Sequence, residues 1–467
     1  MNLKKNILKV FSANFMQLIS SLVVGFFVPA ILSIEGYADL KTYTLYISYI
    51  GFFHLGFLDG IYIKYGGKKL ENIDKKQLKG EHNFFILFQL TVSVIVFLIS
   101  IYCKSIILFL FSISILPIMV SSFHKYIYQA TGEFSKYSKA IYIYTISYML
   151  LNILLAIVFK NQDYRLYCLV TFASNLIVAI LYETKFLINN RKIKGSIPKD
   201  VLKNIKVGFF ILLGNLAVVS LYGIDKWFIK WFLTTEDFAY YSFAVSMLNL
   251  INTLINAISI TFYNYLFDNN SKEKIMKLKK YLVILGGCAS LGYFALSFIV
   301  STFIQKYLPA LQIIAITFSN FPYMILINAL FVNLYKINKN EKKYFTSVVA
   351  ILIVSIVYNI IGLAIFKNAL AIAGATLLTL ITWCIFSHID LKNVYLDKKY
   401  IIYTSILTIS FLVSANLFNW LVGGIVYIGI LIVSTLIIYK EVIFEVKDDI
   451  NKIINKIIRG RQMKIKE

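Results

Sequence analysis

Long apolar runs separated by short basic segments constrain the fold of this 467-residue chain more than any other feature. Hydrophobic residues make up 59% of the sequence and charged residues only 15%. A water-soluble chain of this length has no core large enough to hide so much apolar surface. The sequence therefore predicts a polytopic membrane protein. It excludes a soluble enzyme, a nucleic-acid-binding protein, a disordered chain and a secreted disulfide scaffold.

The runs have the length of transmembrane helices, because a helix needs about 20 residues to cross the hydrocarbon core. Proline is scarce, at 5 residues, which favours helices over the alternating strands of an outer-membrane barrel. We predict an all-α protein with about fourteen spans. The predicted spans are 8–32, 41–60, 83–102, 105–124, 139–159, 165–187, 207–231, 238–266, 281–303, 308–332, 346–366, 369–388, 401–420 and 422–440.

The distribution of basic residues supports this count. With the N-terminus in the cytoplasm and the spans alternating, 39 of the 47 Lys and Arg residues fall on the cytoplasmic side. The eight on the outer side are Lys41, Lys104, Lys160, Arg165, Lys226, Lys230, Lys306 and Lys367. This bias predicts a multi-pass protein of the bacterial cytoplasmic membrane with both termini inside. The net charge of +24 then faces anionic inner-leaflet lipids and no nucleic acid.

An internal repeat is indicated by two matching stretches. Lys136-Tyr137 precedes Asn152 by the same interval that separates Lys343-Tyr344 from Asn359. Repeats of six helices share one orientation, which is typical of secondary transporters with a substrate path between two parallel bundles. The expected divisions are an N-terminal six-helix bundle at 1–206, a C-terminal six-helix bundle at 207–392, an additional helix pair at 393–444 and a cytoplasmic amphipathic tail at 445–467.

Motifs for catalysis and metal binding do not emerge from the sequence. The segment Gly66-Gly67-Lys68 lacks the spacing of a phosphate-binding loop, and Lys69 stands where Ser or Thr is needed. The four histidines and four cysteines match no ligand pattern. We therefore expect no enzymatic activity, no metal and no cofactor. Without an ATP site, transport would use an ion gradient or the gradient of the substrate.

A charged cluster in the predicted seventh span is the first candidate for substrate binding. Lys226 and Lys230 are one helical turn apart, and Asp225 is adjacent. A charge at bilayer depth is costly unless it is paired or faces water. Either the lysines reach the outer interface beside Trp227 and Trp231, or they line the outer end of a cavity.

Amide side chains form the second candidate. Asn249, Asn252 and Asn256 follow a helical spacing in the predicted eighth span, and Asn14 and Gln17 form a similar pair in the first span. Such a stripe either joins neighbouring helices or lines a water-filled path. We predict these five residues as substrate contacts.

The inner end of the predicted second span is a candidate gate. Asp59 and Lys64 lie there within Gly56-Phe57-Leu58-Asp59-Gly60-Ile61-Tyr62-Ile63-Lys64-Tyr65-Gly66-Gly67. The glycines are equally consistent with a plain helix terminus. Both interpretations remain open from the sequence.

The chain as a whole resembles the polysaccharide (Wzx-type) flippases of the MOP superfamily. The resemblance rests on the number of spans, on residues 56–67, on Asp225-Lys226-Trp227-Phe228 followed by Tyr240-Tyr241-Ser242-Phe243-Ala244, and on Ala373-Gly374-Ala375-Thr376 after the Asn359 helix. Related families export drugs by cation coupling or flip the peptidoglycan precursor. The latter typically carry an Arg-Asp pair in the first helix, where this chain has Val23-Val24-Gly25.

The resemblance implies a flippase that moves undecaprenyl-diphosphate-linked oligosaccharide repeat units from the inner to the outer leaflet by alternating access. The product would be O-antigen, capsule or another surface polysaccharide. The implied partners are this lipid-linked glycan, inner-leaflet lipids, a coupling proton or sodium ion, and the polysaccharide polymerase machinery. A diphosphate needs cationic partners, which agrees with the lysines. A membrane-embedded glycan enzyme is the alternative from another class, and the short loops speak against it.

Overall fold

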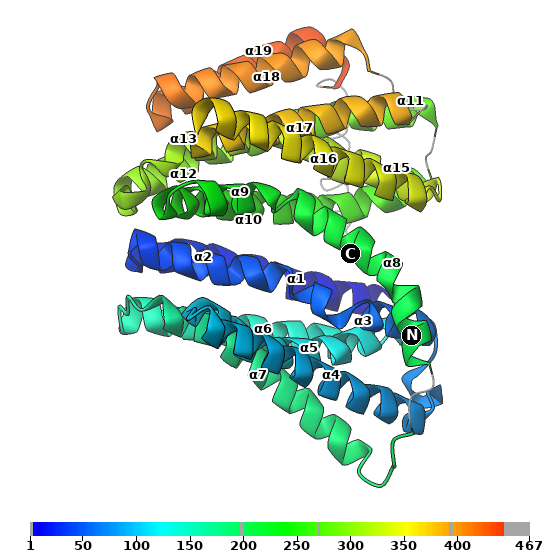
Figure 1. Ribbon diagram of the computed structural model, residues 1–467. Helices are drawn as coiled ribbons and strands as arrows, with labels where there is room; N and C mark the ends of the chain where they lie inside the picture. Colours follow the sequence, from blue (N-terminus) through cyan, green and yellow to red (C-terminus); the bar gives the residue numbers. More distant parts are fainter. Residues whose placement is uncertain (1–2, 197–199, 269–270, 392–393, 395, 443–467) are drawn as a thin grey trace, which may run out of the picture. The chain divides into compact units, whose positions relative to one another are not determined.

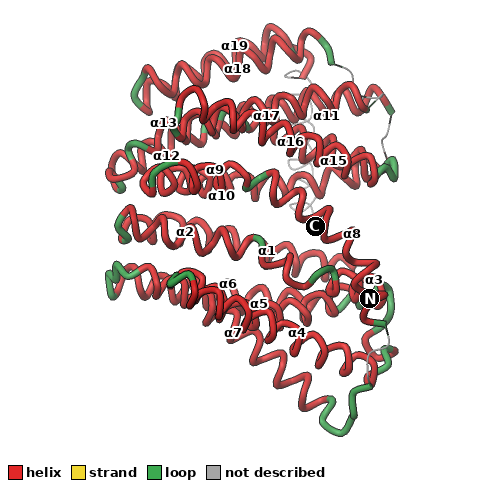
Figure 2. Tube along the Cα trace, viewed as in Figure 1, coloured by secondary structure: helices red, strands yellow, loops and turns green. Residues whose placement is uncertain are grey.

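The computed structural model describes residues 3–196, 200–268, 271–391, 394 and 396–442. Within these ranges the chain forms helices and connecting loops without any strand (Figures 1 and 2). Among the described residues, twelve helical segments are long and apolar enough to cross a membrane. The prediction of an all-α polytopic membrane protein is thereby confirmed. The tail predicted at 445–467 lies outside the described residues.

Two compact units make up the chain, residues 1–246 and 247–467. The helices of the first unit are α1 (Leu3–Ile31), α2 (Ile34–Ser48), α3 (Phe57–Tyr65), α4 (Lys75–Tyr102), α5 (Ile106–Ala130), α6 (Phe134–Ile153), α7 (Tyr164–Asn189), α8 (Val201–Leu221), α9 (Ile224–Phe232) and the beginning of α10 (Thr235–Asp268). Within this unit α8 packs against α3. The division expected at 206 stays a prediction. The two six-helix repeats remain a prediction.

The second unit begins within α10. Its further helices are α11 (Lys272–Ser290), α12 (Gly292–Phe303), α13 (Ala310–Phe318), α14 (Phe321–Leu326), α15 (Val332–Ile337), α16 (Glu341–Phe366), α17 (Ala369–Asp390), α18 (Lys398–Leu417) and α19 (Trp420–Ile438). A π-helical turn, Ile327–Phe331, joins α14 to α15.

Polar caps in the short loops fix where many of these helices begin. The side chains of Ser33, Asp74, Ser105, Asp163, Asn368 and Asn419 each accept a hydrogen bond from a backbone N–H of the first turn that follows. Such caps satisfy amides that a helix terminus leaves without an intrahelical partner. The loops between apolar runs therefore also carry the local signals that start the helices.

Several predicted spans are divided into shorter helices, among them 41–60 and 207–231. Span 41–60 is divided into α2, a short 3-10 helix (Ile50–His54) and α3, with left-handed backbone at Leu55 and Gly56. The freed backbone groups have partners, since Gln89 donates to the Phe53 carbonyl at 3.1 Å and the Gly56 N–H donates to His54 Nδ1 at 3.1 Å. Span 207–231 is divided into α8 and α9 at Tyr222 and Gly223. Breaks inside a membrane segment are tolerated where side chains satisfy the backbone in this way.

Helix α3 crosses α8 with backbone against backbone. A Cβ on Gly208 would lie 1.9 Å from the Gly56 carbonyl oxygen, and a Cβ on Gly60 would lie 2.1 Å from that of Asn204. The glycines of the 56–67 segment therefore allow close helix packing, as small residues do in membrane bundles. This contact places the start of α8 beside the end of α3.

Candidate functional site

The first unit brings together three lysines that the charge bias assigns to the outer side. Lys226 and Lys230 come from α9, and Lys41 comes from α2. All three side chains are half-buried. Asp225 attracts Lys226, and Lys41 repels it more weakly. Asp39 attracts Lys230.

Asp225 lies beside these lysines but its nearest partners are neutral groups. The Tyr241 hydroxyl donates to Oδ2 at 2.5 Å, and the Lys226 backbone N–H donates to Oδ1 at 2.7 Å. The aspartate is buried, with 6% of its surface exposed. In the part of the chain that is described, no ion pair within 4 Å joins Asp225 to a lysine.

The three lysine ammonium groups differ in their hydrogen-bond partners. Lys230 donates to Thr42 Oγ1 at 2.8 Å and lies 5.2 Å from the centre of the Phe238 ring. Lys41 donates to Ser246 Oγ at 2.8 Å. The Lys226 ammonium has neither a hydrogen bond nor an ion pair with any described residue. An ammonium that is partly removed from water and lacks a partner is a ready ligand for an anion.

Aromatic rings contact Trp227, the residue that follows Lys226 in α9. Trp227 stacks on Tyr46 with ring centroids 5.9 Å apart, and it also contacts Tyr49 at 5.8 Å and Trp231 at 5.1 Å. Within the group of Lys41, Lys226 and Lys230, the Lys41 ammonium lies 5.1 Å from the centre of the Tyr37 ring. We call these three residues the lysine cluster.

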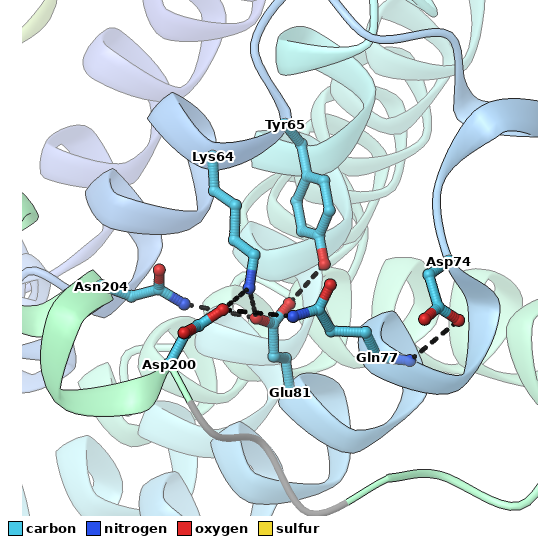
Figure 3. A network of polar contacts seen from close by, with 7 residues as sticks. All are labelled: Lys64, Tyr65, Asp74, Gln77, Glu81, Asp200 and Asn204. Carbon is cyan, nitrogen blue, oxygen red and sulfur yellow. Dashed lines mark hydrogen bonds and ion pairs between the residues drawn. The ribbon is translucent and has the colours of Figure 1, made fainter.

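A second polar network joins α3, α4 and the start of α8 (Figure 3). Lys64 points to the fully buried Glu81, with Nζ 2.5 Å from Oε1, and to Asp200, with Nζ 3.1 Å from Oδ2. Tyr65 donates to Glu81 Oε2 at 2.6 Å, and Asn204 donates to Oε1 at 3.3 Å. The hydrogen bond from Lys64 lowers the pKa of Asp200. We call these five residues the Lys64 network.

The predicted gate residues do not pair with each other. Asp59, one turn and a half before Lys64, instead faces His54, with Nε2 of the histidine 3.8 Å from Oδ2 of the aspartate. Because His54 Nδ1 accepts the Gly56 N–H, its proton is on Nε2 and points to Asp59. Lys64 therefore joins α3 to two other helices. Oδ2 of Asp59 instead lies buried near His54 without a hydrogen bond to any described residue.

Solved structures share this arrangement of helices. A lipid II flippase MurJ in an inward closed conformation is similar with a TM-score of 0.64 and 15% identity, covering 94% of this chain and 99% of that one. The chain has the fold of MOP superfamily transporters. An inward-facing multidrug-resistance MATE transporter of that superfamily is similar with a TM-score of 0.56 and 12% identity, covering 82% of this chain and 97% of the other. The sequence itself matches no protein-family model and no curated protein.

The predicted amide residues are distributed over both units of this MOP fold. Asn14 and Gln17 are exposed on α1, in the first unit. Asn249 is exposed on α10, in the second unit, and Oδ1 of Asn252 is buried without a hydrogen-bond partner. The side chain of Asn256 lies outside the described part of the structure. Their role as substrate contacts stays a prediction.

Several residues of both polar clusters escape sequence reasoning. Lys41 carries a usable signal, since it is one of only eight basic residues on the predicted outer side. Tyr241 and Asn204 carry none, because a tyrosine or asparagine in an apolar run has many possible partners. Glu81 and Asp200 are acidic residues in basic loops, where an acidic side chain is expected to find a lysine.

Proposed function

We propose that this protein is a membrane transporter of the MOP superfamily that flips a polyprenyl-diphosphate-linked oligosaccharide from the inner to the outer leaflet. The fold shared with a lipid II flippase and a MATE transporter supports transport. The observation that carries the choice of substrate is the Lys226 ammonium, which is half-buried, lacks a partner among the described residues and lies near Lys41. This electrostatic environment favours a multiply charged anion.

A diphosphate satisfies the lysine cluster with charge-assisted hydrogen bonds, which are stronger than bonds between neutral groups. The aromatic faces of Trp227, Tyr46 and Tyr49 offer flat apolar surfaces for the adjoining sugar rings. A polyprenyl chain can remain in the lipid outside the helices. The cluster thus matches the headgroup of a glycolipid and not its tail.

The Lys64 network is the proposed inner gate. It connects α3 and α4 to the N-terminus of α8 at the end that the charge bias assigns to the cytoplasm. An arriving diphosphate would stabilise the conformation in which the lysines face it. A ligand drives alternating access only if its affinity differs between the inward-facing and outward-facing conformations. Opening would then separate Lys64 from Glu81 or Asp200.

A cation-coupled drug exporter is the second candidate, because the MATE transporter shares the fold. Such an exporter is expected to present an accessible carboxylate, whereas Asp225 is buried beneath Tyr241. The half-buried Asp39 is already attracted by Lys230. A lipid II flippase would use the same diphosphate chemistry and differs in the sugar and peptide headgroup. Measuring transport of each of these three substrate classes separates the candidates.

The test is flipping by the purified full chain in vesicles. Labelled undecaprenyl-diphosphate-oligosaccharide, lipid II and an organic cation serve as substrates. We expect Lys226→Gln to lose most flipping of the oligosaccharide lipid and Lys226→Arg to retain part of it. Lys104→Gln is the matched control, since Lys104 is exposed and belongs to the same predicted side. Wild-type flipping by the double variant Lys226→Gln, Lys230→Gln would refute the proposal.

The corresponding cellular test is deletion of the gene in a strain without a redundant flippase. Lipid-linked repeat units should accumulate in the inner leaflet, since their synthesis does not need this protein. Normal display of the glycan at the outer face would contradict the function.

A further inference from the structure

Two histidines and a glutamate from three helices of the first unit meet in one place. His82 lies in the first third of α4, His124 lies near the end of α5, and Glu183 belongs to α7. The Nε2 atoms of His82 and His124 lie 2.9 Å and 3.1 Å from the same carboxylate oxygen, Oε2 of Glu183. Their separation along the chain hides this grouping from any pattern based on spacing.

The site is built from buried side chains. His82 and His124 expose 2% and 4% of their surface, and Glu183 is partly buried. Aromatic rings surround the imidazoles: Phe186 lies 4.4 Å from His82 and 5.6 Å from His124, and Phe123 lies 5.2 Å from His82 (centroid distances). This packing holds both imidazole rings in place, so the donor atoms are oriented before any ligand arrives.

The positions of the donor atoms suit a metal ion. Zinc is bound at about 2.0–2.2 Å by imidazole nitrogen and carboxylate oxygen, so tetrahedral ligand atoms lie about 3.3 Å apart. Here the three candidate ligand atoms all lie within 4.8 Å of one another, and each nitrogen is already close to the carboxylate. Small shifts of three side chains would let one ion replace the two hydrogen bonds.

The second nitrogen of His82 gives independent support. Its Nδ1 lies 3.3 Å from the side-chain oxygen of Asn83. When Nε2 binds a metal, the proton of a neutral imidazole is on Nδ1 and is usually donated to an oxygen acceptor. Asn83 supplies this acceptor.

We propose that His82, His124 and Glu183 bind one divalent transition-metal ion, with zinc as the preferred ion and water at the fourth position. Two imidazoles and one carboxylate are a donor set that zinc accepts readily, whereas calcium and magnesium prefer oxygen ligands alone. The ion would clamp α4, α5 and α7 together. This proposal is independent of the transported substrate.

The test measures metal binding and not transport. The full chain is purified in detergent without a histidine tag, loaded with zinc, and freed of unbound metal. We expect one zinc per chain by elemental analysis, a rise in Tm on adding zinc, and no such rise with calcium or magnesium. Cobalt(II) should give the absorption bands of a tetrahedral site.

His82→Gln, His124→Gln and Glu183→Gln should each weaken zinc binding by at least about ten-fold, in line with the losses that even outer-shell changes cause. Glu183→Gln keeps hydrogen-bond acceptors and therefore serves as the variant expected to fold. Asn83→Ala should weaken binding less than these three. His388→Gln is the control, since this buried histidine lies on α17 of the second unit. Equal zinc content in Glu183→Gln and the wild type, or no zinc in the wild type, would overturn the proposal.

Discussion

The hydroxyl oxygen of Tyr241 lies 2.5 Å from Oδ2 of Asp225, and both residues are buried in the first unit. Tyr241 is on α10 and Asp225 is on α9, so the hydrogen bond holds the short broken helix against the long one that follows. It also satisfies a carboxylate oxygen that would otherwise be free to bond the Lys226 ammonium directly. The phenol thereby keeps Asp225 from pairing directly with Lys226, although the carboxylate still attracts that lysine through space.

Replacing Tyr241 by Phe should show how much the hydrogen bond to Asp225 contributes to stability and flipping. Loss of a hydrogen bond to a buried carboxylate costs about 1–3 kcal/mol of the free energy of unfolding. We expect a lower Tm in detergent and weaker flipping, because Asp225 can then turn to Lys226. Tyr62→Phe is the control, since Tyr62 is exposed and its hydroxyl has no described partner. An unchanged Tm would show that the bond to Asp225 contributes little.

The close crossing of α3 and α8 predicts opposite outcomes for two glycines. Gly208→Ala brings a Cβ against the Gly56 carbonyl and should destabilise the protein by at least about 1–3 kcal/mol, as overpacking does. Gly374→Ala, in α17, meets no atom within 4 Å and should stabilise it by about 0.5–1 kcal/mol. Thermal unfolding of both variants checks the pair. Similar Tm values for Gly208→Ala and Gly374→Ala would contradict the close backbone contact between α3 and α8.

The Lys64 network predicts a strong effect of removing its cation. Lys64→Met leaves the Glu81 carboxylate buried without a charged partner, and breaking such a pair costs about 3 kcal/mol. Glu81→Gln in the same chain should recover part of this loss, so the two changes should not be additive. Lys68→Met, at an exposed position, should cost less than about 1 kcal/mol. Chemical unfolding of Lys64→Met, Glu81→Gln, the double variant and Lys68→Met provides the measurement.

The contact between Asp200 and Lys64 predicts a dependence on pH. The folded protein lowers the pKa of Asp200, so the stabilisation is complete above the pKa of the unfolded chain. It is lost as the pH falls through the lower, folded pKa. We expect Asp200→Asn to be less stable than the wild type at pH 7 and equally stable in strong acid. A difference in Tm that stays constant between these conditions would exclude the ionic contact.

The charge bias predicts that Lys194 and Thr235 lie on opposite sides of the membrane. Both are exposed and therefore suitable for cysteine labelling. In a background lacking the four native cysteines, an impermeant reagent added to intact cells should label Thr235→Cys and not Lys194→Cys. Lysed cells should label both, which controls for reactivity. Labelling of both positions from outside would refute the predicted topology.

The sequence by itself determined the membrane class, the helical fold and part of the helix ends, although α4 and α11 begin eight and nine residues before the predicted spans 83–102 and 281–303. These properties are local, because an apolar run of sufficient length must satisfy its backbone internally and a polar cap marks where it starts. The predicted spans 41–60 and 207–231 show the limit of this reasoning. Hydropathy does not register a break at Gly56 or Gly223 when apolar residues continue on both sides.

Only the tertiary structure decided which polar residues meet. Lys64 with Glu81 and Asp200, Tyr241 with Asp225, and His82 with His124 and Glu183 all depend on the faces by which helices pack. In lipid, a helix that is apolar all round has no hydrophobic preference for one face, so packing follows small residues and polar contacts. The backbone contact at Gly56 and Gly208 sets one such crossing, and its partner helix cannot be read from the surrounding apolar sequence.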